Sequence, residues 1–401
     1  LEFRRVLFRS MNRFNALLLN LGHALDHLFL LIFATAVASI ASDFGLQRWE
    51  DLMPYTAGAF VMFGLGSIPA GRLGDLWGRR RMMLVFYFGM GLAALAVALT
   101  QTPLQMAVAL TVLGLFSSIY HPVGIPFLVQ GSKTPGMTIG INGLAGNMGI
   151  ALAALSTGFW VQYFGWRMAF IAPAVLSIVC GYFFWRHAPR ESAPPAKKNV
   201  TPVHLPRHLA LRTVVVMIGS AIASSLLFNF TTNGNAQLLA ERLDGLVYEP
   251  VMLGLLLAII YAVASFAQVV VGRLLDRIPI KPLLFGILLG QAVIFALAAQ
   301  TTGWLWYGAA VLYMISVFAA IPFNDLMVVR YIDDSMRSRV SGFRIAVSFG
   351  ISSLAVYMLG PLVKQQGFTT LMFALSAIAA LGACVVIGLP GEAQMRAARQ
   401  D

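Results

Sequence analysis

The sequence has few charged residues and almost no cysteine. Only 11% of its 401 residues are Asp, Glu, Lys or Arg, against about 25% in soluble domains. So few charges cannot keep the surface of such a long chain in water, which excludes a soluble globular protein. Cys180 and Cys384 both lie in apolar stretches. We interpret them as small packing residues and expect no disulfide and no cysteine-based metal centre.

Two further signatures are missing. No G-x-x-x-x-G-K-[ST] phosphate-binding loop occurs anywhere in the chain, which argues against a transporter driven by nucleotide hydrolysis. The net charge of +12 might suggest a nucleic-acid partner, but the basic residues stand in short loops between apolar runs, as membrane topology requires. We therefore expect a lipid bilayer as partner, no nucleic acid and no cofactor.

Apolar residues make up 59% of the chain and gather in long runs. About 20 apolar residues are needed to cross a bilayer as a helix, which satisfies its own backbone hydrogen bonds. Barrel strands would be near 10 residues long with alternating polarity, unlike these runs. The sequence predicts an all-α integral membrane protein with twelve transmembrane helices, at roughly 14–40, 52–72, 82–100, 104–129, 136–163, 167–187, 211–239, 250–276, 281–300, 303–330, 338–364 and 368–390.

Charge placement predicts the orientation. With both termini in the cytoplasm, the outer side holds only Arg48, Arg167, Arg242 and Lys364, while every other loop lysine and arginine lies inside. This asymmetry follows the positive-inside rule. We expect a multi-pass protein of the bacterial inner membrane with both termini cytoplasmic.

The chain divides at its longest polar stretch, a proline- and lysine-rich linker over 188–210. Residues 1–10, LEFRRVLFRS, resemble a translated adapter scar, and we expect the natural start at Met11. The expected parts are a scar over 1–10, an N-terminal six-helix bundle over 11–187, the cytoplasmic linker over 188–210, a C-terminal six-helix bundle over 211–391, and a cytoplasmic tail over 392–401.

The two bundles repeat one another. Four features recur about 200 positions later in matching helices. The matched pairs are Gly71-Arg72-Leu73-Gly74-Asp75 with Gly272-Arg273-Leu274-Leu275-Asp276, Pro122 with Pro322, Gly149 with Gly350, and Gly165 with Gly367. A duplicated six-helix unit is a known transporter plan, with the substrate site between the halves near the bilayer midplane.

These residues also carry a family resemblance. The stretch Gly71-Arg72-Leu73-Gly74-Asp75-Leu76-Trp77-Gly78-Arg79-Arg80 resembles the Gly-x-Leu-x-Asp-x-x-Gly-Arg-Arg/Lys loop of the major facilitator superfamily. The second copy keeps Gly272, Leu274, Asp276 and Arg277 but lacks the Gly-Arg ending, and Gly165-Trp166-Arg167 is similar to another family turn. Over 11–392 this resemblance implies the major facilitator fold, two pseudo-symmetric bundles in a monomer, and a transporter with no enzymatic activity.

Substrate and direction are less constrained. Tyr120-His121-Pro122, with the His and Asp cluster of the first span, resembles the fosmidomycin-resistance-like branch of exporters. That resemblance implies proton-coupled efflux of a small organic solute. The stretch from Gly140 to Gly158 lacks the proline of the family's antiporter motif, so proton-coupled uptake of a small organic anion or metabolite stays open.

The loop after the second span predicts a conformational latch. Its glycines permit a tight turn and close helix approach, and Asp75 could cap a helix start or pair with an arginine. The alternative is a merely solvated basic loop. The expected latch residues are Gly71, Asp75, Gly78, Arg79, Arg80, Gly272 and Asp276.

The first span carries a polar stripe. Asn20, His23, Asp26 and His27 fall within an arc of about 120° on a helix, and ionisable groups in a membrane are costly and usually functional. Low dielectric favours the neutral carboxyl while a nearby imidazolium favours the ionised one, so Asp26 could load and release protons. Family architecture adds His121 from the fourth span.

We expect these residues, with Asn229 and Asn233 of the seventh span, to couple protons and contact substrate. A fixed His–Asp pair that holds the first helix in place is the structural alternative. A shell of three histidines and one carboxylate is a third, but no acidic or histidine-rich outer loop would collect a metal, so we expect none. A membrane-embedded metalloenzyme is the remote alternative.

Two positions near the inner ends of the tenth and eleventh spans complete the expectations. Asp325 and Arg344 are expected to form an ion pair that serves as an inner gate. Pro122 is expected to bend the fourth span beside His121, either as a rocking point or as a plain kink.

Overall fold

The computed structural model describes residues 13–130, 132, 135–189, 207–275, 277–331, 334–391 and 394. Within these ranges every regular element is helical, as the apolar runs predict. The chain separates into two compact units, one of Leu1–Ala196 with Val247–Ile259 and the other of Lys197–Leu246 with Ile260–Asp401. Each is described by itself.

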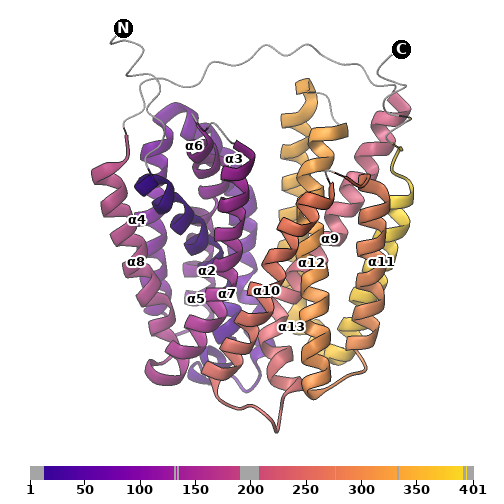
Figure 1. Ribbon diagram of the computed structural model, residues 1–401. Coiled ribbons are helices and arrows are strands. Elements are labelled where there is room, and N and C mark those ends of the chain that lie inside the picture. Colours follow the sequence, from indigo (N-terminus) through magenta and orange to yellow (C-terminus); the bar gives the residue numbers. More distant parts are fainter. Residues whose placement is uncertain are drawn as a thin grey trace. The chain divides into compact units, whose positions relative to one another are not determined.

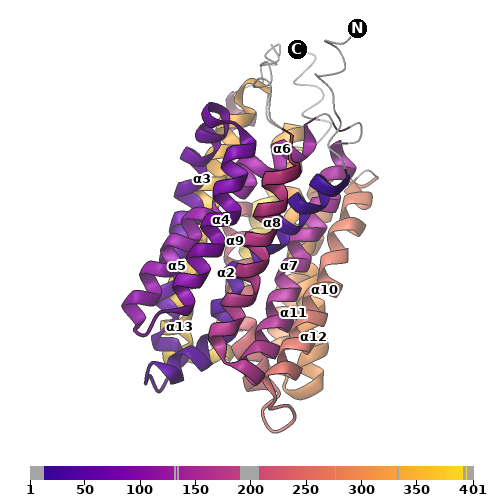
Figure 2. The same ribbon diagram turned by 90° about the vertical axis from the view of Figure 1, so that its left-hand side faces the viewer.

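The first unit is a bundle of long helices connected by short turns (Figure 1). Helices α4, α5 and α8 lie side by side in it (Figure 2), and α2 packs closely on α7. Its elements are α2 (Arg13–Asp43), η1 (Trp49–Asp51), η2 (Met53–Thr56), α3 (Ala57–Trp77), α4 (Arg79–Ala98), α5 (Pro103–Ser117), η3 (Tyr120–Gly124), α6 (Ile125–Val129), α7 (Pro135–Phe164) and α8 (Trp166–His187).

The second unit is built mainly on α13, which packs against both α9 and α11. Its elements are α9 (Arg207–Arg242), most of α10 (Pro250–Leu275), α11 (Ile280–Ala298), α12 (Gly303–Tyr331) and α13 (Asp334–Ile387). Gly367 interrupts α13 with a non-helical φ of 74°. It therefore divides α13 into segments that correspond to the expected spans 338–364 and 368–390.

Eleven helices in the described part of the chain are long and apolar enough to cross a membrane. Because α13 holds two expected spans, this agrees with the prediction of twelve. Large apolar side chains such as Leu305 (72% exposed) and Leu104 (70% exposed) stand on the outside. Extensive exposed apolar surface would cause aggregation in water but is the natural lipid-facing surface of a bundle. The chain is a multi-pass membrane protein.

Glycines at two matched positions of the repeat adopt the same backbone conformation. Gly165, between α7 and α8, has φ 86° and ψ 162°, and Gly367 has φ 74° and ψ 167°. This region of φ/ψ space is essentially restricted to glycine. The sequence repeat is therefore also a structural one, because both copies turn the chain in the same way.

The fourth span is irregular at its centre. Helix α5 ends at Ser117, and Tyr120–Gly124 forms one π-helical turn that contains Pro122. Proline lacks the N–H that a regular helix would use, and π turns recur at functional sites. The predicted distortion beside His121 is thus a π turn, and it re-aims the side chains of η3 relative to those of α5.

Candidate functional site

Three histidines meet inside the first unit. His23 and His27 lie one turn apart on α2, and His121 lies on η3. One ring nitrogen from each falls within 4.8 Å of those of the other two. His23 is buried, while His27 and His121 are partly exposed. The structure therefore brings together the three histidines that the sequence analysis selected.

The His23 ring is fixed by a hydrogen bond to the main chain of α7. Its Nδ1 lies 2.7 Å from the carbonyl oxygen of Asn142. A carbonyl oxygen only accepts, so Nδ1 of His23 carries the hydrogen. The Nε2 of His23 lies 3.1 Å from Nε2 of His27, and in neutral His23 it can only accept. Nε2 of His27 must then donate, so one carbonyl determines the tautomers of both rings.

Asp26 is fully buried beside these rings. Its Oδ1 accepts a hydrogen bond from the Ser117 hydroxyl, and its Oδ2 lies 3.6 Å from Nε2 of His121. That Oδ2 has no hydrogen-bond partner among the described residues. A carboxylate away from water is stable only when it is paired with a cation or protonated. Asp26 therefore needs either a proton of its own or a protonated His121 beside it.

A second layer of polar groups holds the cluster. The Tyr120 ring stacks on His23, with centroids 4.7 Å apart and planes at 12°. Its hydroxyl donates to the Leu19 carbonyl at 2.7 Å. Nδ2 of Asn142 donates to the Tyr120 hydroxyl and to Oδ1 of Asn20, both at 2.8 Å. Asn20 therefore joins the network through Asn142, on α7.

The sequence analysis did not identify Asn142 or Tyr120 as residues that hold the histidine cluster in place. Asn142 stands within the glycine-rich stretch of α7, which was considered only for its missing proline. A polar side chain between Gly140 and Gly143, in an apolar span, was the available signal. It could not reveal that the carbonyl of the same residue fixes His23, because that contact depends on how α2 and α7 pack.

Glycines on α7 make this packing close. A Cβ at Gly146 would lie 2.7 Å from Cε1 of His23, and a Cβ at Gly149 would collide with the Ala24 carbonyl. Real Cβ atoms essentially never approach so near. Close helix approach through small residues is typical of membrane bundles. Here it gives the His23 ring its space.

The expected latch loop contacts the segment that carries His121. A Cβ at Gly71 would lie 3.3 Å from Cβ of Pro122, and one at Gly74 would lie 3.0 Å from Cγ2 of Val123. Helix α3 therefore rests its glycines directly on η3. A shift of α3 would be transmitted to His121 through this contact.

The rest of the latch joins neighbouring helices of the same unit. Gly78 turns the chain between α3 and α4 with φ 92°. Arg79 donates to the Pro126 carbonyl at 3.1 Å, and Arg80 donates to the Ala188 carbonyl at 3.0 Å. Asp75 is exposed, and the described residues offer it no ion-pair partner. The two arginines, and not Asp75, make the contacts seen here.

The expected residues of the second unit are only partly described. Asn229 and Asn233 are buried on α9. Nδ2 of Asn229 donates to the Ser352 hydroxyl at 2.8 Å, and Nδ2 of Asn233 donates to the Asn229 carbonyl at 3.1 Å. Oδ1 of Asn233 has no partner among the described residues. Gly272 is exposed, while Asp276 and the side chains of Asp325 and Arg344 lie outside the described part.

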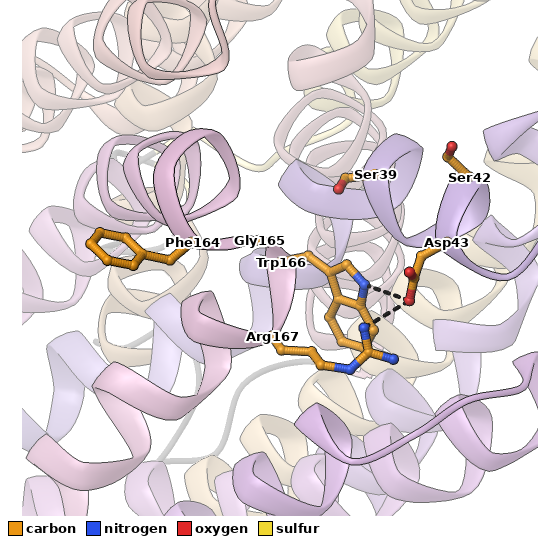
Figure 3. Close-up of a pocket in the computed structure, with 7 residues that line it drawn as sticks. All are labelled: Ser39, Ser42, Asp43, Phe164, Gly165, Trp166 and Arg167. Atoms are coloured by element: carbon orange, nitrogen blue, oxygen red, sulfur yellow. Dashed lines mark hydrogen bonds and ion pairs between the residues drawn. The ribbon is translucent and has the colours of Figure 1, made fainter.

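A pocket at the C-terminal end of α2 shows what holds this helix in place (Figure 3). Oδ2 of Asp43 accepts from Nη1 of Arg167 at 2.7 Å and from the Trp166 indole at 3.1 Å. Arg167 also lies 4.4 Å over the Trp166 ring and donates to the Thr100 carbonyl. These contacts clamp the end of α2 to the start of α8, on the helix that carries the histidines.

Comparison with known proteins agrees with this architecture. A family model described as Major Facilitator Superfamily matches residues 19–355. Among curated relatives, the efflux pump terJ of Aspergillus terreus is 24% identical over 68% of this chain and 50% of its own length. The gallate transporter of Pseudomonas putida is 26% identical over 39% of this chain and 34% of its own length. The chain thus spans half the length or less of these relatives.

Solved structures show the same fold at lower identity. A bacterial homolog of the human lysosomal transporter Spinster, inward-facing and unoccupied, superposes with a TM-score of 0.71 at 16% identity and covers 94% of this chain and 95% of that one. A D-xylose-proton symporter gives a TM-score of 0.72 at 16% identity, covering 92% and 96%. Both likenesses extend over nearly the whole of each chain.

Proposed function

Because the chain belongs to the Major Facilitator Superfamily, we propose that it is a proton-coupled transporter that exports a small organic solute by alternating access. Secondary transport across a membrane follows from the family. Proton coupling and the outward direction are the proposal. Ionisable side chains within one bundle would bind and release the proton, so no nucleotide-binding loop is needed.

The observation that carries the proposal is the proximity of the buried Asp26 to the partly exposed His121. Oδ2 of Asp26 lies 3.6 Å from Nε2 of His121 and has no hydrogen-bond partner among the described residues. Ionisable groups inside a membrane mark proton relays when they face one another or a water-filled path. The His121 side chain is 37% exposed, so a proton can be exchanged from that side while Asp26 stays enclosed.

Two states of this pair support a coupled cycle. When Asp26 or His121 carries the proton, the negative charge of the buried Asp26 carboxylate is neutralised and no further cation is required. After the proton leaves, the carboxylate needs a donor or positive group in its place. A solute with a hydroxyl, amine or amide group could supply that contact. Proton and solute would then alternate at one site, as an exchanger requires.

The remaining expected residues receive roles within this proposal. His23, His27 and Asn20 would contact solute or relay protons beside Asp26. From the second half, Asn229 and Asn233 would hydrogen-bond the solute, and Asp325 with Arg344 would form the inner gate. The loop from Gly71 to Arg80, with Gly272 and Asp276 in the second copy, would act as the latch. The contact of Gly71 and Gly74 with η3 supports a link between latch and site.

Efflux is favoured over uptake by the exporter-like Tyr120-His121-Pro122 segment. Several relatives are named for export or resistance, among them a tetracenomycin C resistance and export protein of Streptomyces glaucescens. The specific alternative is uptake of a small aromatic acid. It is supported by the names of two relatives, the gallate transporter and the 3-(3-hydroxy-phenyl)propionate transporter of Escherichia coli.

The cellular setting is part of the proposal. We propose a bacterial inner membrane with both termini in the cytoplasm, which the distribution of the basic residues supports. We expect the chain to work as a monomer, because this fold holds its pathway within one chain, and to bind solute, protons and lipid without nucleic acid or enzymatic activity.

The decisive experiment measures proton release when solute is added to purified protein. A pH-sensitive dye would follow additions of amphipathic drugs, phosphonates and small aromatic acids to the intact chain and to Asp26→Asn. Asp51→Asn, an exposed acid in η1, is the matched control. A signal present in the intact chain and the control but absent in Asp26→Asn supports coupling at this residue. Equal solute binding in all three without any pH change would demote Asp26 to a structural role.

Direction needs a separate measurement. Inside-out membrane vesicles energised with an acid interior would accumulate an exported solute, and right-side-out vesicles with an acid exterior would accumulate an imported one. Accumulation only in right-side-out vesicles would replace efflux by uptake. Accumulation in neither, with binding intact, would point to another coupling ion.

A further inference from the structure

We propose that His23, His27 and His121 together form a binding site for one divalent transition-metal ion of the zinc class. Their ligand nitrogens lie within 4.8 Å of one another, and neutral imidazole is a preferred ligand of Zn²⁺, Co²⁺, Ni²⁺ and Cu²⁺. The sequence analysis gave a shell of these histidines as one alternative but expected no metal, because the chain has no cysteine set and no acidic or histidine-rich outer loop. The inference rests on the geometry that folding creates.

The distance between the His23 and His27 ring nitrogens is close to the one that a shared metal ion requires. Two nitrogens at about 2.0–2.1 Å from a tetrahedral zinc are about 3.3–3.4 Å apart. Nε2 of His23 and Nε2 of His27 are 3.1 Å apart. An ion would take the place of the hydrogen that His27 donates there, and the hydrogen of neutral His27 would then stand on its Nδ1. Two histidines four residues apart on one helical face are the arrangement by which helices present paired imidazoles to zinc. His121 completes the trio from η3, with its ring 5.0 Å from that of His23, centroid to centroid.

The surroundings of the rings are those of an oriented ligand set. Metal-binding histidines almost always donate their other ring N–H to a carbonyl or carboxylate, which fixes the nitrogen that binds the ion. Nδ1 of His23 donates to the Asn142 carbonyl at 2.7 Å, which leaves its Nε2 for the ion. Tyr120 stacks on the same ring. Asp26, 3.6 Å from His121, would supply the negative charge that a buried cation requires.

A purely structural role explains less of this arrangement. The hydrogen bond to Asn142 would hold His23 without any other histidine. It does not explain why His27 and His121 also direct ring nitrogens toward His23. Inside a membrane, apolar side chains could have filled these two positions. The partly exposed His121 provides an entry path. Three protein ligands leave a fourth position for water or for a donor atom of a solute.

The test uses the purified chain, with an affinity tag that contains no histidine, and Co²⁺ as the probe metal. Bound Co²⁺ would be followed by its visible absorption and by equilibrium dialysis with metal analysis, and Zn²⁺ would be used to displace it. The variants are His23→Ala, His27→Ala, His121→Ala and Asp26→Asn. The matched control removes the other three histidines of the chain, as His187→Ala, His204→Ala and His208→Ala combined.

We expect one Co²⁺ per chain, with a spectrum typical of few ligands, and its displacement by Zn²⁺. Loss of any one cluster histidine should weaken binding by more than about 100-fold, because it removes a ligand and not only an outer partner. Asp26→Asn should weaken it by about 10- to 100-fold, as for outer-shell carboxylates. The triple control variant should bind within about twofold of the intact chain.

Two results would overturn the proposal. One is the absence of any retained Co²⁺ or Zn²⁺ at millimolar metal. The other is binding that survives the three cluster substitutions and disappears in the control. Where a variant does not elute as a single species, His27→Gln and His121→Gln replace the alanines and keep a side chain of similar size. Solute-driven proton release is measured with EDTA present, so failure here leaves the proposed transport function untouched.

Discussion

His23 and His27 share one hydrogen bond, Nε2 to Nε2 at 3.1 Å, and the Asn142 carbonyl decides which ring donates it. This relationship makes the two rings a single unit. A change that breaks the bond between His23 and the Asn142 carbonyl removes the contact that determines the tautomers of both rings.

Gly146→Ala should impair the site by displacing His23. The Cβ added at this position would lie 2.7 Å from Cε1 and 2.8 Å from Nε2 of that ring. Helix α7 has no room to move toward α2, because Gly149 already packs directly against the Ala24 carbonyl. We expect solute-dependent proton release to fall at least about 10-fold, equivalent to 1.4 kcal/mol of binding or barrier. Transport in proteoliposomes would measure the same loss.

The control is Gly143→Ala, three residues earlier on α7, where a Cβ meets nothing within 4 Å. It should keep near-normal activity, and the gain in helix propensity should leave stability unchanged or slightly higher. Equal activity of both variants would mean that the His23 ring position is unimportant for transport.

Tyr120→Phe should reduce activity while leaving the ring stack on His23 intact. It removes the hydroxyl that donates to the Leu19 carbonyl and accepts from Asn142. Leaving buried polar partners unsatisfied costs about 1–3 kcal/mol. Part of that cost appears as looser positioning of Asn142 and hence of His23. Transport at saturating solute and the thermal midpoint in detergent would both be recorded.

Tyr87→Phe separates positioning from stability. The Tyr87 hydroxyl donates to the Leu18 carbonyl at 2.7 Å, one residue from the bond that Tyr120 makes, but among the described residues it makes no hydrogen bond to Asn142 or to the histidines. We expect a similar loss of thermal stability with transport preserved. If both variants lose transport equally, the effect of Tyr120 is on the bundle as a whole.

The helical architecture could be predicted from the sequence, because the length of the apolar runs and the repeat constrain it directly. Even the break at Gly367 agrees with the two separate spans expected there. The sequence also selected His23, Asp26, His27 and His121, since ionisable residues stand out in an apolar span. It could not find the Asn142 carbonyl or the Gly146 contact. Both depend on how α7 is rotated about its own axis where it packs against α2. Every residue has a backbone carbonyl, so the sequence does not show which one will make a contact.

Gly74→Ala should disturb coupling between the latch and the site. The added Cβ would lie 3.0 Å from Cγ2 of Val123, so η3 and its His121 must shift by a few tenths of an ångström. We expect transport to fall severalfold with little change in solute affinity. The measurement is a comparison of maximal rate with apparent affinity in proteoliposomes.

Gly286→Ala on α11 is the control, because Gly286 is exposed and a Cβ there meets nothing within 4 Å. Replacing an exposed helical glycine by alanine favours the helix by about 0.5–1 kcal/mol. Transport should remain near normal. A larger loss in Gly286→Ala than in Gly74→Ala would contradict a link that runs through Val123.

The clamp of Asp43 on Arg167 should contribute to stability without taking part in transport. The two groups are 43% and 40% exposed and 2.7 Å apart, and exposed pairs of this kind contribute about 0.2–1 kcal/mol. A double-mutant cycle with Asp43→Asn and Arg167→Gln, measured as thermal midpoints in detergent, should show coupling of that order. The coupling should shrink in 1 M salt, where screening acts over about 3 Å.

The control is Glu50→Gln. It breaks the ion pair with Arg48, two residues away in the same loop, so it cannot loosen α2 from α8. Transport should survive all of these changes. Its loss in Asp43→Asn at unchanged stability would instead make the clamp part of the transport cycle.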